Sequence, residues 1–242
     1  MTEDNTTINV QLENGSPAFA KPVLGAVPST IVYLEDCTKA LKRFDDNYFD
    51  VAIVDPPYGI GEDGGKARTR GSKRTNGEKK GWDNERPNAE YFAELMRVSK
   101  NQIIWGANYM IDKIQKPSMG WIFWDKGMEF QDFSDGELAY TSFEKALKKY
   151  RFVWNGMLQG DMKNKETRIH PTQKPTQLYK WLLHNYAKQG DKILDTHLGS
   201  MSIAIACHDY GYHLTGCELD HDYFADGIKR VNSHIKQLSL FA

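Results

Sequence analysis

Short apolar runs alternate with amphipathic segments along most of the chain, and this alternation constrains the fold more than any other feature. The runs are four to six residues long and rich in valine, isoleucine, tyrosine and tryptophan, as strands inside a sheet are. The predicted strands are residues 31–34, 49–54, 102–105, 121–124, 138–143, 151–154, 192–195 and 213–217. The predicted helices are residues 38–44, 88–99, 107–114, 175–187, 202–210 and 223–237. This order predicts an α/β fold, with a mostly parallel, twisted sheet and helices on both faces.

The chain divides into a polar leader and one larger domain. Residues 1–28 contain three prolines and no hydrophobic periodicity, so we expect a flexible leader that precedes a domain over residues 29–242. Residues 61–80 carry seven basic side chains and five glycines, which predicts a mobile basic loop. The net charge is only -1, so a nucleic-acid partner would have to be bound by local clusters of this kind.

Several classes of protein are excluded by what the sequence lacks. No run approaches the roughly 18 consecutive apolar residues of a membrane span, and the polar, acidic amino terminus differs from a secretory signal peptide. The cysteines, Cys37, Cys207 and Cys217, have no CxxC spacing, and no histidine pair has HExxH spacing. We therefore expect a cytoplasmic protein with reduced cysteines, no membrane contact and no metal site.

Ligands of open α/β sheets bind outside the carboxyl ends of the strands, and one predicted strand ends in an unusual sequence. Residues 49–54 are followed by Asp55, Pro56, Pro57 and Tyr58. The carboxylate can accept a hydrogen bond from an exocyclic amine, the prolines hold the next carbonyl rigid, and the tyrosine ring can stack on a flat base. These properties suit a nucleobase extruded from a duplex. The alternative is a proline-rich turn that exposes one aromatic side chain.

A second pattern lies near the carboxyl end of the chain. Asp195 ends a predicted strand, Gly199 and Ser200 precede a predicted helix, and Glu218 follows the next strand, 23 residues after Asp195. A glycine at a helix amino terminus lets the backbone approach a ligand, and an acid after the next strand can accept the hydroxyls of a ribose. This spacing favours a nucleotide site. An ordinary strand–helix–strand unit with a capping serine would show the same spacing.

Together these motifs resemble the S-adenosylmethionine-dependent amino-methyltransferases of DNA. Residues 55–58 resemble the catalytic motif of that family, and residues 170–175 (His-Pro-Thr-Gln-Lys-Pro) resemble the motif that precedes its cofactor-binding strand. The catalytic motif comes first, as in the circularly permuted β class. The resemblance covers about residues 30–235 and implies a Rossmann-like methyltransferase fold, S-adenosylmethionine as cofactor and double-stranded DNA as partner.

The resemblance also implies roles for individual residues. The implied catalytic residues are Asp55, Pro56, Pro57 and Tyr58. The implied cofactor contacts are Asp36, Cys37, Asp55, Thr172, Lys174, Asp195, His197, Gly199, Ser200 and Glu218. The implied DNA contacts are Lys66, Arg68, Arg70, Lys73, Arg74, Lys148, Lys149, Lys163 and Lys165, with target recognition within residues 129–169.

The cofactor loop departs from the family's usual pattern, Asp-Pro-Phe-x-Gly-Ser-Gly-Thr. This chain has Thr196, His197, Met201 and Ser202 at the second, third, seventh and eighth positions. The main hypothesis is a site-specific DNA adenine N6-methyltransferase, because an aspartate rather than a serine heads the catalytic motif. A cytosine N4-methyltransferase and a catalytically impaired DNA-binding relative are the alternatives. A homodimer and a cognate restriction endonuclease are further expected partners.

Overall fold

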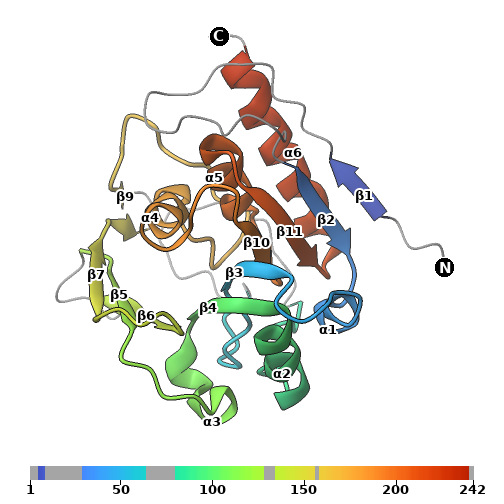
Figure 1. The fold of residues 1–242 in the computed structure, drawn as a ribbon. Helices are drawn as coiled ribbons and strands as arrows, with labels where there is room; N and C mark the ends of the chain where they lie inside the picture. The colour runs from blue at the N-terminus through green and yellow to red at the C-terminus, as the bar shows by residue number, and fades with distance from the viewer. Residues whose placement is uncertain (1–4, 9–28, 64–79, 128–133, 156–157, 240–242) are drawn as a thin grey trace.

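Nine strands form one continuous sheet through the centre of the computed structural model, which describes residues 5–8, 29–63, 80–127, 134–155 and 158–239 (Figure 1). Their order across the sheet is β1-β2-β11-β10-β3-β4-β6-β5-β7. The strands are β1 (Asn5–Ile8), β2 (Thr30–Leu34), β3 (Phe49–Val54), β4 (Ser99–Trp105), β5 (Trp121–Asp125), β6 (Gly136–Thr141), β7 (Lys148–Arg151), β10 (Lys192–Asp195) and β11 (His213–Glu218). Two further strands, β8 (Trp154–Asn155) and β9 (Leu158–Gln159), form a small separate sheet.

The five central strands are parallel, which confirms the predicted mostly parallel sheet. β2, β11, β10, β3 and β4 pair in parallel, whereas β6 lies antiparallel between β4 and β5. Val51 of β3 lies opposite Ile193 of β10, although the two are 142 residues apart in the sequence. The strand that follows β3 in the sequence, β4, lies on one side of this pair, and the strand that follows β10, β11, lies on the other. β3 and β10 therefore flank a topological switch point, where ligands of such sheets bind.

Helices cover both faces of the sheet, as predicted (Figure 1). α4 (Thr176–Tyr186), α5 (Ser202–Tyr210) and α6 (His221–Ser239) pack on one face. α1 (Cys37–Leu41), α2 (Ala89–Val98), the 3₁₀ turn η1 (Ala107–Tyr109) and α3 (Ile111–Ile114) pack on the other. Successive residues of β3 enter opposite cores: Val51 and Ile53 belong to the first, and Ala52 and Val54 to the second. A strand buried on both faces is a continuous apolar run, which is the signal that predicted it.

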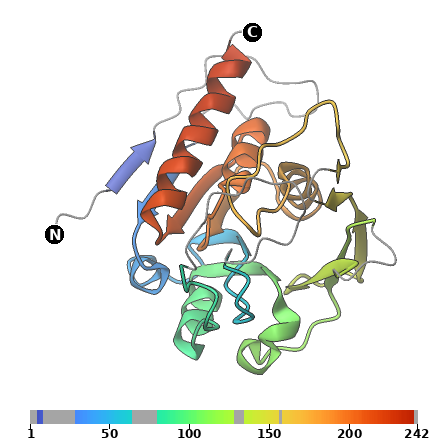
Figure 2. The same ribbon diagram turned by 180° about the vertical axis from the view of Figure 1, so that it is seen from behind.

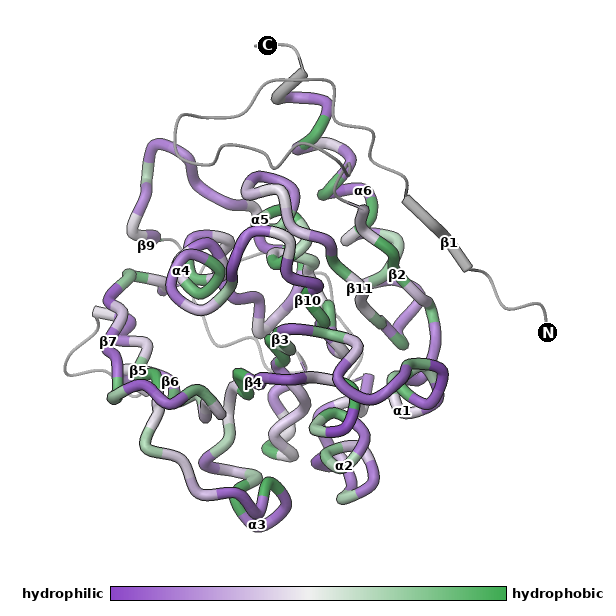
Figure 3. Tube along the Cα trace, viewed as in Figure 1, coloured by the Kyte–Doolittle hydropathy of each residue, from purple (hydrophilic) through white to green (hydrophobic). Residues whose placement is uncertain are grey.

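The long helix α6 lies against β11, and the view from behind shows its full length (Figure 2). Phe224, Ile228, Val231 and Ile235 recur at three- or four-residue intervals and pack on the core, as expected of an amphipathic helix. Hydropathy colouring shows the same alternation of apolar and polar residues along the helix (Figure 3). No helix in the described part of the chain is long and apolar enough to cross a membrane.

Three segments differ from the predicted elements. Residues 5–8, within the expected leader, form β1 and cover the hydrogen-bonding edge that β2 would otherwise expose; the rest of the leader lies outside the described residues. The predicted helix 107–114 is two short turns, because Met110 has a non-helical backbone (φ −130°, ψ 13°). The predicted strand 151–154 is divided between β7 and β8, which belong to different sheets. β7 is an edge strand with three of four side chains exposed, so it lacks apolar alternation.

Candidate active site at the carboxyl edge of the sheet

The predicted site residues lie where the carboxyl ends of the parallel strands meet. Asp55 follows β3, Asp195 ends β10 and Glu218 ends β11. Asp36 lies two residues after β2. Because β3, β10 and β11 are neighbours, three carboxylates from distant parts of the sequence come together at the switch point.

A buried carboxylate shapes the loop that follows β3. This residue, Asp83, is 3% exposed. It accepts hydrogen bonds from the backbone amides of Tyr58, Gly59 and Glu62 at 2.7, 2.9 and 2.8 Å. The backbone amide of Gly61 donates to the Asp83 carbonyl at 3.0 Å. Charge-assisted bonds of this kind fix the turn after two prolines, which have no amide hydrogen of their own.

Both oxygens of the Asp55 carboxylate have polar partners. The Tyr58 hydroxyl donates to Oδ1 at 2.8 Å, and Lys174 Nζ lies 2.5 Å from Oδ2. The side chain of Lys174 is 3% exposed, and its Nζ also lies 3.1 Å from Glu137 Oε2. Burial raises the pKa of the Asp55 carboxyl, and the Lys174 ammonium opposes this rise. The sequence pointed to Asp55, Tyr58 and Lys174, but not to Glu137.

Glu137 reaches the site because β6 runs antiparallel to its neighbours. The amino end of β6 therefore lies at the same edge as the carboxyl ends of β3 and β4. The Glu137 carboxylate lies between two ammonium groups, with Lys126 Nζ at 2.6 Å and Lys174 Nζ at 3.1 Å. Although burial raises it, Lys174 and Lys126 hold the pKa of Glu137 down at about 2. The carboxylate is thus ionised at neutral pH.

The Tyr58 ring is packed between other groups. It stacks on Tyr109 of η1, with ring centroids 5.2 Å apart and an interplanar angle of 16°. Gly106 has a left-handed backbone (φ +63°), and a Cβ at this position would lie 2.1 Å from a carbon of the Tyr58 ring. Both the backbone and the ring therefore require glycine here. Burial raises the pKa of Tyr58 well above its usual range, so the hydroxyl keeps its proton and donates a hydrogen bond to Asp55.

Asp195 is the most deeply buried acid of the site, at 1% exposure. Its Oδ1 accepts a hydrogen bond from the backbone amide of His197 at 3.0 Å. Burial raises the pKa of Asp195 to about 8, and the charges of Asp55 and Glu218 add to the rise. No cationic side chain of the described residues forms an ion pair with Asp195. Its carboxyl group is therefore suited to a cationic ligand.

Glu218 ties the loop after β10 to the end of β11. Its carboxylate accepts hydrogen bonds from the backbone amides of Gly199 at 2.7 Å and of Leu219 and Asp220 at 2.9 Å. Gly199 has a left-handed backbone, with φ +49°. Burial raises the pKa of Glu218 despite these three bonds. A carboxylate has about four lone-pair sites, so it can accept one further hydrogen bond.

His197 stands where the resembling family has phenylalanine. Its Nδ1 lies 2.9 Å from the Thr196 hydroxyl and its Nε2 lies 3.9 Å from Cys37 Sγ. The Tyr91 ring packs edge-on against it at 5.4 Å. Burial lowers the pKa of His197 to about 4 and raises the pKa of Cys37 to about 12. At neutral pH the imidazole is therefore a flat, uncharged ring in the place of the phenylalanine.

The other predicted cofactor residues lie along the same edge. The Thr172 hydroxyl lies 3.2 Å from His170 Nδ1. The His170 ring lies 3.6 Å from where a Cβ of Gly199 would be, so the segment that contains both residues packs on the loop after β10. Ser200 is buried within that loop. Asp36 caps α1 by accepting a hydrogen bond from a backbone amide of that helix.

Met201, another departure from the family pattern, has a left-handed backbone (φ 57°) and a fully buried side chain. Left-handed geometry at this position explains why a glycine is usual there. The Met201 side chain lies over Gly227 of α6, where an added Cβ would come within 2.7 Å of Met201 Cγ. The Met201 side chain thus fills the space that Gly227 of α6 leaves next to the loop.

The predicted DNA contacts are spread over the chain. Lys66, Arg68, Arg70, Lys73 and Arg74 lie outside the described residues. Lys148, Lys163 and Lys165 are exposed. Lys149 is exposed on β7 and forms an ion pair with Asp125 at 2.7 Å. The structure therefore places Lys148 and Lys149 on the edge strand of the sheet, and Lys163 and Lys165 on the segment after β9.

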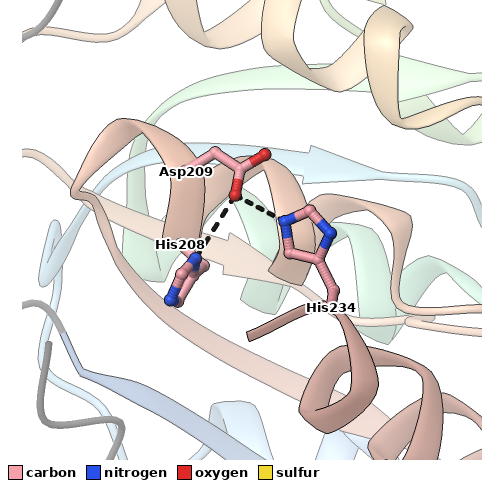
Figure 4. A group of neighbouring side chains, drawn as sticks. All are labelled: His208, Asp209 and His234. Carbon is pink, nitrogen blue, oxygen red and sulfur yellow. Dashed lines mark hydrogen bonds and ion pairs between the residues drawn. The ribbon is translucent and has the colours of Figure 1, made fainter. Parts of the chain in front are cut away.

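A second polar cluster joins α4, α5 and α6, and Figure 4 shows its members on α5 and α6. Asp209 Oδ1 lies 3.3 Å from His208 Nδ1 and 2.6 Å from His234 Nε2, and Lys180 Nζ lies 2.6 Å from Oδ2. Although burial raises it, hydrogen bonds from these three side chains hold the pKa of Asp209 well below its usual range. The two histidines and the carboxylate are a set that metals use. The Lys180 ammonium, however, already neutralises the carboxylate, so we assign the cluster a structural role between helices.

Sequence comparison connects the chain to methyltransferases. Residues 108–229, half of the chain, match the DNA methylase family. Type II methyltransferase M.HpaI of Haemophilus parainfluenzae is 27% identical over 240 residues, which cover 81% of this chain and 72% of that protein. A further relative, Type II methyltransferase M2.MboI of Moraxella bovis, is 26% identical over 211 residues, 72% of this chain and 77% of that protein.

Two solved structures have a similar fold. The M1.HpyAVI–SAM complex matches with a TM-score of 0.51 at 19% identity, over 83% of this chain and 99% of that one. PvuII DNA methyltransferase, described as cytosine-N4-specific, matches with a TM-score of 0.52 at 12% identity, over 86% and 92% of the two chains. The predicted Rossmann-like methyltransferase fold and the resemblance to amino-methyltransferases are confirmed. On the family match and this shared fold, the chain belongs to the DNA methylase family.

Proposed function

We propose that the protein transfers a methyl group from S-adenosylmethionine to the N6 amine of adenine in double-stranded DNA, at a specific site. The observation that carries this proposal is the position of Asp55. Asp55 comes before two rigid prolines and lies at the switch point, near the buried Asp195 of β10 and the half-buried Glu218 of β11. A hydrogen-bond acceptor for an amine and a site for a cationic cofactor are thereby adjacent. Membership of the DNA methylase family supports this chemistry.

The residues present fit S-adenosylmethionine. Three carboxylates crowd the edge of the sheet, and burial and mutual repulsion raise the pKa of Asp195 to about 8. A ligand that carries sulfonium and ammonium charges would relieve this repulsion. In our assignment, Asp195, Gly199 and Ser200 line the methionine part, Glu218 accepts one ribose hydroxyl and Asp36 accepts the adenine amine. Cys37, Thr172 and His197 complete the surroundings. The M1.HpyAVI structure of similar fold is a complex with SAM.

The mechanism follows from the acceptors around Asp55. S-adenosylmethionine supplies, when bound, a methyl group activated by its positively charged sulfur. The Asp55 carboxylate and the Pro56 carbonyl accept the two hydrogens of the target amine, and so direct the nitrogen lone pair towards the methyl carbon. The nitrogen–carbon bond forms as the carbon–sulfur bond breaks. The surplus proton then passes from the nitrogen to Asp55 and on to solvent.

In the proposed complex, the target base displaces two groups: the Tyr58 hydroxyl from Asp55, and the Tyr109 ring from the Tyr58 ring. The Tyr58 hydroxyl donates to Oδ1 of Asp55, and Tyr109 covers a face of the Tyr58 ring. In the proposed complex the amine replaces the hydroxyl on Asp55. The base then stacks on the Tyr58 ring where Tyr109 now lies, since stacking on an aromatic ring stabilises an extruded base.

Adenine is preferred to cytosine because Asp55 heads the catalytic motif, where cytosine enzymes of the resembling family more often carry serine. The similarity to the cytosine-N4-specific PvuII enzyme is one of fold and does not decide between the two bases. Cytosine N4 is therefore the second candidate target. The third candidate, a catalytically impaired DNA-binding relative, is disfavoured by the loop after β10. Of its altered residues, Met201 is buried and His197 is half-buried, and both leave Gly199 and Glu218 joined.

The test is methyl incorporation from labelled S-adenosylmethionine into mixed-sequence duplex DNA, with the modified base identified by mass spectrometry. We expect N6-methyladenine from the wild-type protein and none from the Asp55→Ala variant, which should still bind the cofactor. N4-methylcytosine would select the second candidate. Cofactor binding without any incorporation would contradict the proposed substrate, and the absence of cofactor binding would select the impaired relative.

DNA contacts and partners form a separate part of the proposal. Phosphate contacts by the basic loop at residues 61–80 and by Lys148, Lys149, Lys163 and Lys165 would position the duplex, with recognition within residues 129–169. The Type II names of the relatives support a cognate restriction endonuclease. The expected homodimer is checked by the mass of the protein in solution.

A further inference from the structure

Four side chains of alternating charge form a row at the catalytic edge. Lys126 Nζ lies 2.6 Å from Glu137 Oε1, Glu137 Oε2 lies 3.1 Å from Lys174 Nζ, and Lys174 Nζ lies 2.5 Å from Asp55 Oδ2. The four residues come from the end of β5, the start of β6, the segment before α4 and the end of β3. The row therefore joins the far part of the sheet to the residue proposed to accept the target amine.

Lys174 is held at the centre of the row by its backbone as well. The carbonyl of the preceding residue, Gln173, accepts a hydrogen bond from Trp154 Nε1 at 2.7 Å, and the Gln173 side chain accepts one from the backbone amide of Ile169 at 3.0 Å. The ammonium is 3% exposed, so water does not compensate its charge. A buried charge is retained only with close partners of opposite sign, and Lys174 has two such partners.

We propose that Lys174 and Glu137 are positioning residues for methyl transfer: Glu137 holds the Lys174 ammonium against Asp55, and Lys174 keeps the Asp55 carboxylate ionised and directed towards the target amine. This inference rests on the proposed function, because it takes Asp55 as the acceptor of that amine. It gives Lys174 a role other than the cofactor contact that the family resemblance implies.

The charges that face Asp55 come from every element packed around it. Lys174 is the only cation among the described residues paired with it, and it opposes the effect of burial. Glu137 on β6 and Asp195 on β10 are acids that favour the protonated form of Asp55. Tyr58 donates its hydroxyl hydrogen to Asp55. The buried hydroxyl of Tyr179 on α4 is a neutral neighbour. Removal of Lys174 and removal of the Glu137 charge should therefore move the titration of Asp55 in opposite directions.

The experiment compares the wild-type protein with Lys174→Met and Glu137→Gln. The Glu137→Gln variant keeps an oxygen that can accept the Lys174 hydrogen bond and removes only the charge. The Asp55 carboxyl signal is followed by carbon NMR from pH 4 to 9 without DNA and assigned by its loss in Asp55→Asn. We expect its midpoint to rise by at least one pH unit in Lys174→Met and to fall in Glu137→Gln. Equal or same-direction shifts would overturn the proposal.

Kinetics supply the second readout. For Lys174→Met we expect at least a tenfold loss of the methyl-transfer rate at pH 7, an acid limb of the pH profile displaced upwards, and a cofactor Kd within threefold of wild type. Lys174→Arg, which keeps the charge, should return the acid limb to its wild-type position. A cofactor Kd raised tenfold with an unchanged rate would assign Lys174 to the cofactor and overturn the proposal.

Folding and the proposed function are tested separately. Lys174→Gln replaces Lys174→Met if the latter fails to fold, which thermal unfolding reports. The NMR titration needs no activity. If the wild-type protein methylates nothing but the two variants shift the Asp55 midpoint in opposite directions, the proposed function is rejected and the control of Asp55 by Lys174 is supported. If the wild-type protein is active but the Asp55 midpoint is the same in both variants as in the wild type, only the positioning role is rejected.

Discussion

The Asp83 carboxylate accepts a hydrogen bond from the backbone amide of Tyr58 at 2.7 Å, across 25 residues of sequence. The same carboxylate also binds the amides of Gly59 and Glu62. The position of the catalytic loop therefore depends on one acid that lies outside the catalytic motif. In the proposed function, Asp83 would orient the loop that contacts the base without touching base or cofactor itself.

Asp83→Ala should impair both stability and methyl transfer. The substitution leaves three part-buried backbone amides without their charged acceptor, which should lower the free energy of unfolding by about 2–3 kcal/mol. We expect methyl transfer to fall more than tenfold, because the Tyr58 backbone is no longer fixed. Urea unfolding and single-turnover kinetics measure the two effects. Asp83→Asn keeps one acceptor oxygen and should lie between the wild type and Asp83→Ala; a fully active Asp83→Ala variant would contradict the role.

Asp195→Asn should stabilise the protein at pH 8 while it weakens cofactor binding to an extent that calorimetry can still measure. Burial raises the pKa of Asp195 in the folded state to about 8, above its value in the unfolded chain. Ionisation of Asp195 therefore lowers the free energy of unfolding as the pH rises from the pKa of the unfolded state to that of the folded state. At pH 8 the variant should exceed the wild type by about 1–3 kcal/mol, with no gain near pH 4. Urea unfolding at both pH values checks this, and a gain that does not depend on pH would contradict it.

Cofactor binding should release a proton at pH 7. The Asp195 carboxyl is mostly protonated in the free protein at that pH, and a cationic ligand favours the ionised form. The cofactor Kd should therefore fall as the pH rises from 6 to 8, by about tenfold per unit at most. Calorimetry in two buffers of different ionisation enthalpy counts the protons. Asp195→Asn is the control, and proton release in that variant would assign the effect to another group.

Met201→Gly and Met201→Ala should separate backbone strain from side-chain packing. Both variants lose the buried side chain that packs against Gly227, so both should be less stable than the wild type by about 2 kcal/mol or more. Glycine tolerates the left-handed backbone at this position, which costs alanine about 1 kcal/mol. Met201→Gly should thus be the more stable of the two in thermal unfolding. An alanine variant at least as stable as the glycine variant would show that the loop relaxes out of this geometry.

The central strands were predictable because their signals are local. Residues 49–54 form a largely apolar run that Asp55 follows, and residues 192–195 form one that ends in Asp195; the structure has strands with these bounds. Sheets buried on both faces need such runs whatever their neighbours are. Asp55, Asp195 and Glu218 were found for the same reason, since each follows or ends a run of this kind.

The missed residues depend on contacts between distant segments. Glu137 lies at the beginning of a strand, and only the antiparallel direction of β6 brings it to the site. Asp83 binds backbone groups, which leave no pattern of side chains. Lys174 was identified as a site residue, but its partners on β3 and β6 are set by the order of strands across the sheet.

β10 and β11 are synthesised after every other strand of the described sheet, yet they lie in the middle of it. During translation β2 and β3 leave the ribosome with unpaired inner edges and gain their partners only when residues 192–218 follow. Asp55 is then without Asp195 and Glu218 beside it, and open strand edges are sites where chains aggregate. We therefore expect the edge that carries Asp55, Asp195 and Glu218 to assemble only once Glu218 has left the ribosome.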